Sequence, residues 1–171
     1  MAEGLAEQIA ALADRVIATY KNGGRVLVFG NGGSAADATH LASELVGRYD
    51  RDRKALPALA LTTDTPTITS ISNDFGYEQV FARQIDAHAK PNDLVIGITT
   101  SGKSRNVIAG IEAARKIGCY TVALSGRDGG PIASIADATT IVPSQVTARI
   151  QEGHAVIIHI ICELVDHWIL G

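Results

Sequence analysis

The stretch that decides the fold reads Arg25-Val-Leu-Val-Phe-Gly30-Asn31-Gly32-Gly33-Ser34. Its four consecutive apolar residues, bounded by glycine, are typical of a strand that is buried on both faces, as in a parallel sheet. The glycines after the strand let the backbone turn sharply, and a helical pattern of apolar residues begins at Ser34. A buried strand that turns directly into a helix indicates an α/β protein.

The same alternation of short apolar strands and amphipathic helices continues on both sides of this stretch. Before it, apolar residues at helical spacing end at Asn22-Gly23-Gly24, which is a helix C-cap signal. After it, we expect strands at 57–62, 93–99, 119–124 and 139–142, and helices at 34–48, 67–72, 78–89, around 107–114 and at 147–170. We therefore predict one α/β domain over residues 1–171, a three-layer, doubly wound, five-stranded parallel sheet of flavodoxin-like order flanked by helices.

The composition argues against several classes of protein. The chain has 171 residues, 46% hydrophobic and 19% charged, which suits one domain with a real core and not a disordered chain. A net charge of −3 argues against nucleic-acid binding. We expect no membrane span and no signal peptide. The two cysteines, Cys119 and Cys162, are assigned to the core, and so few cysteines fit a cytoplasmic protein.

Two strand ends carry residues that are suited to binding a phosphate group. After the strand at 25–30, glycines allow a close approach to the backbone, and the helix N-terminus offers free N–H groups to an anion. After the strand at 93–99, four hydroxyl groups and a lysine precede another helix in Thr99-Thr100-Ser101-Gly102-Lys103-Ser104. Either loop alone could be an ordinary turn with an N-cap residue. Together they predict a site for a small phosphorylated molecule, and neither has the pattern of a nucleotide-binding loop.

A second set of polar residues could bind a metal ion or transfer protons. His40 and Glu44 are four residues apart, so they share one face of a helix. His159 lies in a nearly continuous apolar run, where an unpaired imidazole would be costly to bury. Gln151 precedes it by about 12 Å of helix, so the two could meet at one ion only at a frayed helix start or between chains. A surface His–Glu pair and a hydrogen-bonded core histidine are the alternatives.

The chain resembles the bacterial phosphoheptose isomerases, which are enzymes with a sugar-isomerase (SIS) domain. The resemblance covers about residues 5–170. It rests on the segments 30–44, 73–77, 99–104 and 149–154. The joint presence of His40, Glu44, Gln151 and His159 is its most specific part.

The resemblance implies a ketose–aldose isomerase that converts sedoheptulose 7-phosphate to a D-glycero-D-manno-heptose 7-phosphate through a metal-assisted enediol, in heptose biosynthesis. It implies one Zn²⁺ per subunit, held by His40, Glu44, Gln151 and His159, with Glu44 and His159 also catalytic. It further implies a homotetramer with active sites between subunits, and a small phosphorylated sugar as partner, without nucleic acid or membrane. The substrate-binding positions are Asn31, Gly32, Gly33, Ser34, Arg48, Asp74, Thr99, Thr100, Ser101, Ser104 and Gln151.

Two departures from the family pattern accompany this resemblance. The family usually has a further N-terminal helical stretch, so we expect part of the subunit interface to differ here. Some members carry an acidic residue at the position of Ala148, whose loss could change sugar preference. Two other functions stay open: isomerisation of a pentulose or hexulose phosphate, and a non-catalytic SIS-type protein that associates with the bacterial replication initiator.

Overall fold

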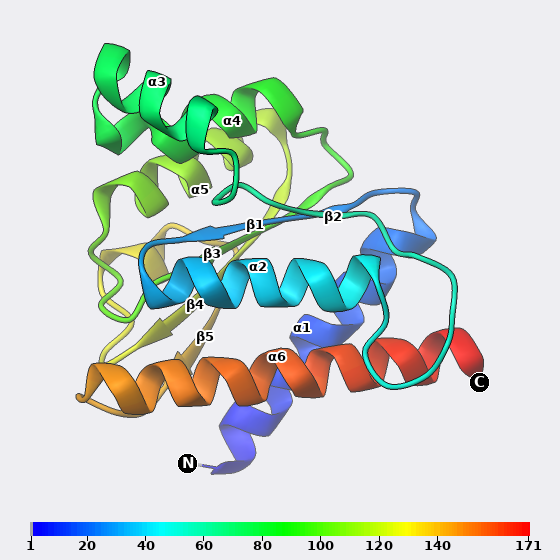
Figure 1. Cartoon of the computed structure of the whole chain (residues 1–171). Coiled ribbons are helices and arrows are strands. Elements are labelled where there is room, and N and C mark those ends of the chain that lie inside the picture. The colour runs from blue at the N-terminus through cyan, green and yellow to red at the C-terminus, as the bar shows by residue number, and fades with distance from the viewer. Residues whose placement is uncertain (1) are drawn as a thin grey trace.

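Five parallel strands form the central sheet of the computed structural model, which describes residues 2–171 (Figure 1). Their order is β2-β1-β3-β4-β5, which is the flavodoxin-like order. The predicted α/β class and doubly wound parallel sheet are confirmed. The strands are β1 (Val26–Gly30), β2 (Ala58–Ala60), β3 (Leu94–Ile98), β4 (Tyr120–Gly126) and β5 (Ala138–Val142).

The helices follow the predicted alternation with the strands. They are α1 (Ala2–Lys21), α2 (Gly33–Val46), α3 (Thr65–Phe75), α4 (Val80–His88), α5 (Arg105–Ile117) and α6 (Thr147–Leu170), with short 3₁₀ segments η1 (Tyr77–Gln79) and η2 (Pro131–Ser134). The strand expected at 57–62 is shorter, because a turn follows it and α3 begins early. Asp64 caps that helix by accepting a hydrogen bond from the backbone N–H of Thr67.

Helices cover both faces of the sheet, as Figure 1 shows. Alternate residues of β1 point to opposite faces, so Val26 and Val28 pack with α1, α2 and α6, whereas Leu27 and Phe29 pack with α4 and α5. All five residues of β1 are buried. The continuous apolar run of this strand is therefore explained by burial on two sides.

The strand order reverses between β1 and β3, which are neighbours in the middle of the sheet. Gly30 pairs with Ile98, so the loops that follow these two strands start side by side. A Cβ atom at Gly30 would lie only 2.7 Å from the Ser34 carbonyl oxygen and 2.8 Å from that of Ile98. Ligands of open α/β sheets bind at such a reversal, beyond the carboxyl ends of the strands.

Helix α6 differs from expectation in one respect. It is long and apolar enough to cross a membrane by length and composition, although we expected no such segment. The most apolar 18-residue window of α6 contains at most two charged residues, and 39% of this window is buried. The helix packs against α1 and α2. Val156 and Leu164 nevertheless remain exposed on it.

The loop between α2 and β2 is held in place by one buried arginine. The Arg53 side chain is 0% exposed, and its Nε lies 2.8 Å from the Asp166 carboxylate on α6. Its other nitrogens donate to the carbonyl groups of Glu44 and Leu45 at 2.7 and 2.8 Å. These contacts tie the C-terminal end of α2 to α6, so the two helices keep a fixed relation.

We predict that Arg53→Met lowers the free energy of unfolding by about 3–5 kcal/mol, because it leaves the Asp166 carboxylate buried without its partner. Urea denaturation followed by circular dichroism measures this loss. The matched variant Arg51→Met removes an exposed guanidinium from the same loop and should change stability by about 0.5 kcal/mol or less. Equal losses in the two variants would contradict the assignment.

Candidate active site

A cleft of about 230 Å³ opens at the carboxyl ends of β1 and β3. The loop after β1 contributes Asn31 and Ser34, and the loop after β3 contributes Thr99, Thr100 and Ser104. The start of α6 closes the third side with Thr147 and Gln151, and the remaining lining residue is Ile98. The structure thus brings six of the predicted substrate-binding residues together.

The hydroxyl groups of the second loop are available to a ligand. Ser104 stands at the N-cap of α5, yet its side chain makes no capping hydrogen bond and instead lies 3.2 Å from the Thr99 hydroxyl. Gly102 adopts a φ of +67°, and a Cβ atom there would lie 1.9 Å from the Gly129 carbonyl oxygen. The loop therefore packs closely against the backbone at Gly129, and Gly102 adopts a left-handed backbone conformation that favours glycine.

None of the described side chains that line the cleft is charged, so an anion would be held by hydroxyl groups, amides and helix N-termini. Gln151 reaches the cleft because Gly33 has no side chain. A Cβ atom at Gly33 would lie 2.0 Å from the Gln151 Nε2 atom. Gln151 is the fifth residue of α6 and is helical, so it does not lie at a frayed helix start.

A second cluster lies further along α2 and α6. The His40 Nε2 atom lies 3.3 Å from the Glu44 Oε1 atom and 3.3 Å from the His159 Nε2 atom. The two imidazole rings meet edge to face, with centroids 5.0 Å apart, and the Tyr49 ring lies 5.6 Å from that of His159. Within residues 2–171, no three His, Cys, Asp or Glu side chains form a group that could by themselves hold a metal ion.

The cleft and the His cluster occupy different levels of one helix pair. Helices α2 and α6 run side by side in the same direction (Figure 1). His40 follows Ser34 by six residues, or about 9 Å of helix, and His159 follows Gln151 by about 12 Å. The chain therefore places Gln151 at the cleft, and His40, Glu44 and His159 together about two turns beyond it.

The remaining predicted site residues lie outside the cleft in this chain. Arg48 donates a hydrogen bond to the Asp50 carbonyl, and the Asp74 carboxylate accepts one from Asn73. The Ser101 hydroxyl accepts a hydrogen bond from the Lys103 backbone N–H. Gly32 serves the turn itself, with a φ of +55° at the N-cap of α2.

Comparisons with known proteins identify the family of this chain. The family model of the SIS domain matches residues 1–126. The phosphoheptose isomerase of Trichlorobacter lovleyi is 51% identical over 98% of this chain and 85% of its own length. That of Aquifex aeolicus is 52% identical over 96% of this chain and 86% of its own. The solved phosphoheptose isomerase of Neisseria gonorrhoeae superposes with a TM-score of 0.90 at 43% identity, covering 95% of this chain and 87% of that one.

The chain belongs to the phosphoheptose isomerase family of SIS-domain proteins. The resemblance drawn from the sequence motifs is thereby confirmed. The sugar isomerase domain of the RpiR transcription factor from Sphaerobacter thermophilus is also similar, at 19% identity and a TM-score of 0.63. That likeness shows the shared fold alone.

Several residues at or near the site are not among those that the sequence analysis assigned to it. Thr147 lines the cleft, and Asn106 and Tyr77 bond to Asn31 beside it. His154 is fully buried, and its Nε2 atom lies 3.1 Å from the Ser125 carbonyl oxygen at the end of β4. It does not line the cleft and holds a strand end in place. The sequence signal for Asn106 is a polar residue at an otherwise apolar helix position.

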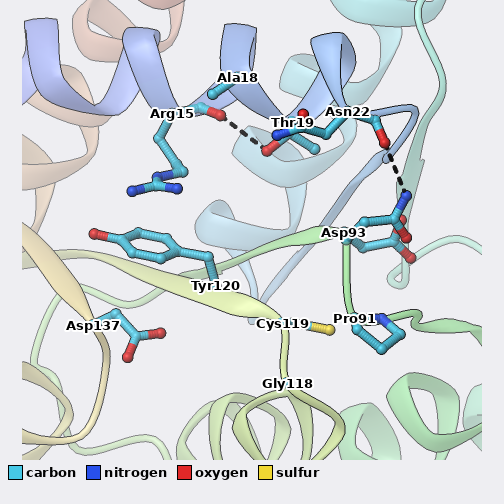
Figure 2. Close-up of a pocket in the computed structure, with 11 residues that line it drawn as sticks. Arg15, Ala18, Thr19, Asn22, Pro91, Asp93, Gly118, Cys119, Tyr120 and Asp137 are labelled. Atoms are coloured by element: carbon cyan, nitrogen blue, oxygen red, sulfur yellow. Dashed lines mark hydrogen bonds between the residues drawn. The ribbon is translucent and has the colours of Figure 1, made fainter.

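The chain has another cavity at the opposite edge of the sheet, shown in Figure 2. The Arg15 guanidinium lies over the Tyr120 ring at 3.8 Å from its centroid. The carboxylates of this cavity serve the fold, because Asp93 accepts hydrogen bonds from Arg25 and Lys90, and Asp137 accepts two from Thr121. This cavity lies at the amino ends of the strands, away from the loops that follow β1 and β3.

Both cysteines are core residues, as the sequence indicated. Burial raises the pKa of the Cys119 thiol to about 11, with a further contribution from Asp93. Burial likewise raises the pKa of the Cys162 thiol to about 12, with Glu44 and Asp166 adding to it. Both side chains are therefore neutral thiols at neutral pH and serve packing.

We predict that Gly33→Ala displaces Gln151 from the cleft and lowers isomerase kcat/KM by about tenfold or more. The atom it meets is the end of a flexible side chain, so the melting temperature should change little. Gly4→Ala, in helix α1 with no atom within 4 Å of the added Cβ, is the matched control. Unchanged kcat/KM in Gly33→Ala would show that Gln151 does not act in the cleft.

The buried His154 also predicts a pH dependence of stability. Burial lowers the pKa of its imidazole, which outweighs the opposing hydrogen bond to Ser125. The contribution of the neutral His154 to the free energy of unfolding is complete above the unfolded pKa of about 6.5, and it is lost as the pH falls. The free energy of unfolding should therefore fall by up to about 1.4 kcal/mol per pH unit below that value, until the folded pKa is passed.

Urea unfolding of the wild-type protein and of His154→Gln at about pH 7.5 and about pH 5.5 tests this. The variant should lose less stability on acidification than the wild type does. His88→Gln, which replaces an exposed histidine at the end of α4, should behave like the wild type. Identical pH dependence in all three proteins would contradict the prediction.

Proposed function

We propose that this protein isomerises sedoheptulose 7-phosphate to D-glycero-D-manno-heptose 7-phosphate. The observation that carries the proposal is the placement of a hydroxyl-lined cleft and a His–Glu–His cluster at two levels of one helix pair. A phosphate bound in the cleft would leave the other end of an open-chain sugar extended along α2 and α6. The curated relatives named phosphoheptose isomerase support the same substrate.

Neutral hydrogen-bond donors bind the phosphate. Ser34, Thr99, Thr100 and Ser104 present hydroxyl groups, and Asn31 and Gln151 present amides, around one cleft. The N-termini of α2 and α5 add partial positive charge. Site residues outside the cleft, namely Gly32, Gly33, Arg48, Asp74 and Ser101, are assigned to shaping the loops or to completing the site from another subunit.

Proton transfer is assigned to Glu44 and His159. Glu44 removes a proton from C1 of the ketose, and the electron pair forms the C1–C2 double bond of an enediol. His159 donates a proton to the C2 oxygen as that bond forms. Return of a proton to C2, with loss of the proton on the C1 oxygen, gives the aldose. His40, within 3.3 Å of both side chains, orients them.

We propose that the same cluster, completed by a fourth donor from another subunit, holds one Zn²⁺ ion per subunit. Ligand atoms on a tetrahedral zinc with bonds of about 2.0–2.1 Å lie about 3.3–3.4 Å apart, and the His40–Glu44 and His40–His159 atom pairs are each 3.3 Å apart. Imidazole, carboxylate and amide groups are suitable donors, and the proposed ligands are His40, Glu44 and His159 of one chain together with Gln151 supplied by another chain. Bound zinc would polarise the sugar carbonyl and stabilise negative charge on its oxygen.

We further propose a homotetramer with active sites shared between subunits. Gln151 lies about 12 Å along α6 from His159, and Arg48 and Asp74 lie outside the cleft of their own chain. Exposed Val156 and Leu164 give α6 an apolar surface that another subunit can cover. We place this assembly, one SIS domain per chain, in the cytoplasm and in heptose biosynthesis.

The assignment predicts that Glu44→Gln and His159→Ala each lower kcat by about 10²-fold or more, because each removes a proton-transfer group. The assay follows sedoheptulose 7-phosphate turnover, with the zinc content of each variant measured by mass spectrometry. Glu112→Gln, an exposed acid on α5, is the control and should keep full activity. Near-normal turnover in both site variants would refute the assignment.

A panel of substrates separates the alternatives. The wild-type protein is assayed on sedoheptulose 7-phosphate and on pentulose and hexulose phosphates, each with and without a chelator. Fastest turnover of the heptulose, lost on chelation, supports the proposal. Preference for a shorter sugar would indicate another isomerase, to which the absence of an acid at Ala148 could contribute. No turnover of any sugar would favour the non-catalytic SIS-type protein.

A further inference from the structure

Two asparagine side chains join the two loops of the cleft. The Asn31 Nδ2 atom donates to the Asn106 Oδ1 atom at 2.8 Å, and the Asn106 Nδ2 atom donates back to the Asn31 Oδ1 atom at 2.8 Å. Asn31 belongs to the loop after β1, whereas Asn106 is the second residue of α5, two positions after Ser104. The pair therefore links the two walls of the phosphate cleft.

Asn106 is buried and has a fixed orientation. Asn106 is only 4% exposed. Its Oδ1 atom also accepts a hydrogen bond of 3.0 Å from the Val107 backbone N–H. A backbone N–H can only donate, so this contact determines which end of the Asn106 amide is oxygen. The Asn106 NH₂ group must then face Asn31, and it requires the oxygen of Asn31 opposite it.

Tyr77 reinforces the same orientation from a third segment. Its hydroxyl group donates to the Asn31 Oδ1 atom at 2.9 Å. The Asn31 oxygen thus accepts two hydrogen bonds, which saturates its two lone pairs. The Asn31 NH₂ group uses one of its two protons on Asn106, so one N–H remains uncommitted among the described contacts, at a residue that lines the cleft.

We infer that Asn106 is a positioning residue that makes Asn31 present an N–H donor, and not its carbonyl oxygen, to the phosphorylated substrate. This inference rests on the proposed function, because it assigns the anion of that substrate to the cleft. An Asn31 amide free to rotate would offer its oxygen to the anion part of the time, and an oxygen repels a phosphate. Asn106 acts through Asn31 and does not itself line the cleft.

The test combines steady-state kinetics with inorganic phosphate binding measured by calorimetry. Asn106→Ala removes the partner without adding charge, and it should raise both KM and the phosphate dissociation constant about tenfold, with kcat nearly unchanged. Tyr77→Phe removes one supporting hydrogen bond from a half-exposed residue and should raise both about two- to threefold. Asn106→Asp should weaken binding at least as much as Asn106→Ala.

Two controls make the readout specific to positioning. Asn92→Asp adds the same charge at the opposite edge of the sheet and should leave KM unchanged. In an Asn31→Ala background, Asn106→Ala should have no further effect on phosphate binding, because its partner is already gone. A purely structural role for Asn106 would instead weaken binding in both backgrounds.

The outcomes separate this inference from the proposed function. The inference is overturned, and the function stands, if Asn106→Ala turns over normally with unchanged KM and unchanged phosphate binding. The same holds if phosphate binding is weaker in Asn106→Asp but not in Asn106→Ala. A wild-type protein that binds phosphate but isomerises no sugar, with weaker phosphate binding in Asn106→Ala, retains the inference and rejects the function. A wild-type protein that neither isomerises nor binds phosphate rejects both.

Discussion

The pairing of Gly30 with Ile98 at the ends of β1 and β3 is the contact on which the site depends. The strand order reverses between these two strands, so their connections leave toward opposite sides and open a gap at the carboxyl edge. Only glycine at position 30 lets the start of α2 lie so close to the sheet. The pairing of β1 with β3 therefore positions the loops that follow these two strands, together with the N-termini of α2 and α5.

The helix pair α2 and α6 extends from the cleft along one face of the sheet. Arg53 holds the C-terminal half of this pair through Asp166 and the carbonyl groups of α2, and Gly33 admits Gln151 at the other end. Between these anchors, His40, Glu44 and His159 meet at distances that suit hydrogen bonding or a shared ion. The same apolar surface that gives α6 the composition of a membrane span serves the core on one side and remains available to another subunit on the other.

Much of the fold and part of the site could be predicted from local patterns. The apolar run before Gly30 indicated a strand buried on both faces, and the alternation of strands and helices indicated the doubly wound sheet. The hydroxyl-rich residues from Thr99 to Ser104 and the His40–Glu44 spacing are also local signals, because they depend on residues within one turn of helix or loop. The short strand β2 and the early start of α3 were harder to predict, because a single cap at Asp64 decides them.

By itself, the sequence determined the fold class, the two phosphate-type loops and the residue types of the His cluster, because these follow from spacing within single elements. Residue spacing alone left the positions of Gln151 and His159 open, and only the tertiary structure gives the contacts that bring Gln151 to the cleft and His159 to His40, since side chains on two helices meet according to how the helices pack. It also brought Asn31 and Asn106 together from positions 75 residues apart. No local pattern specifies that contact, because it depends on the register of β1 against β3.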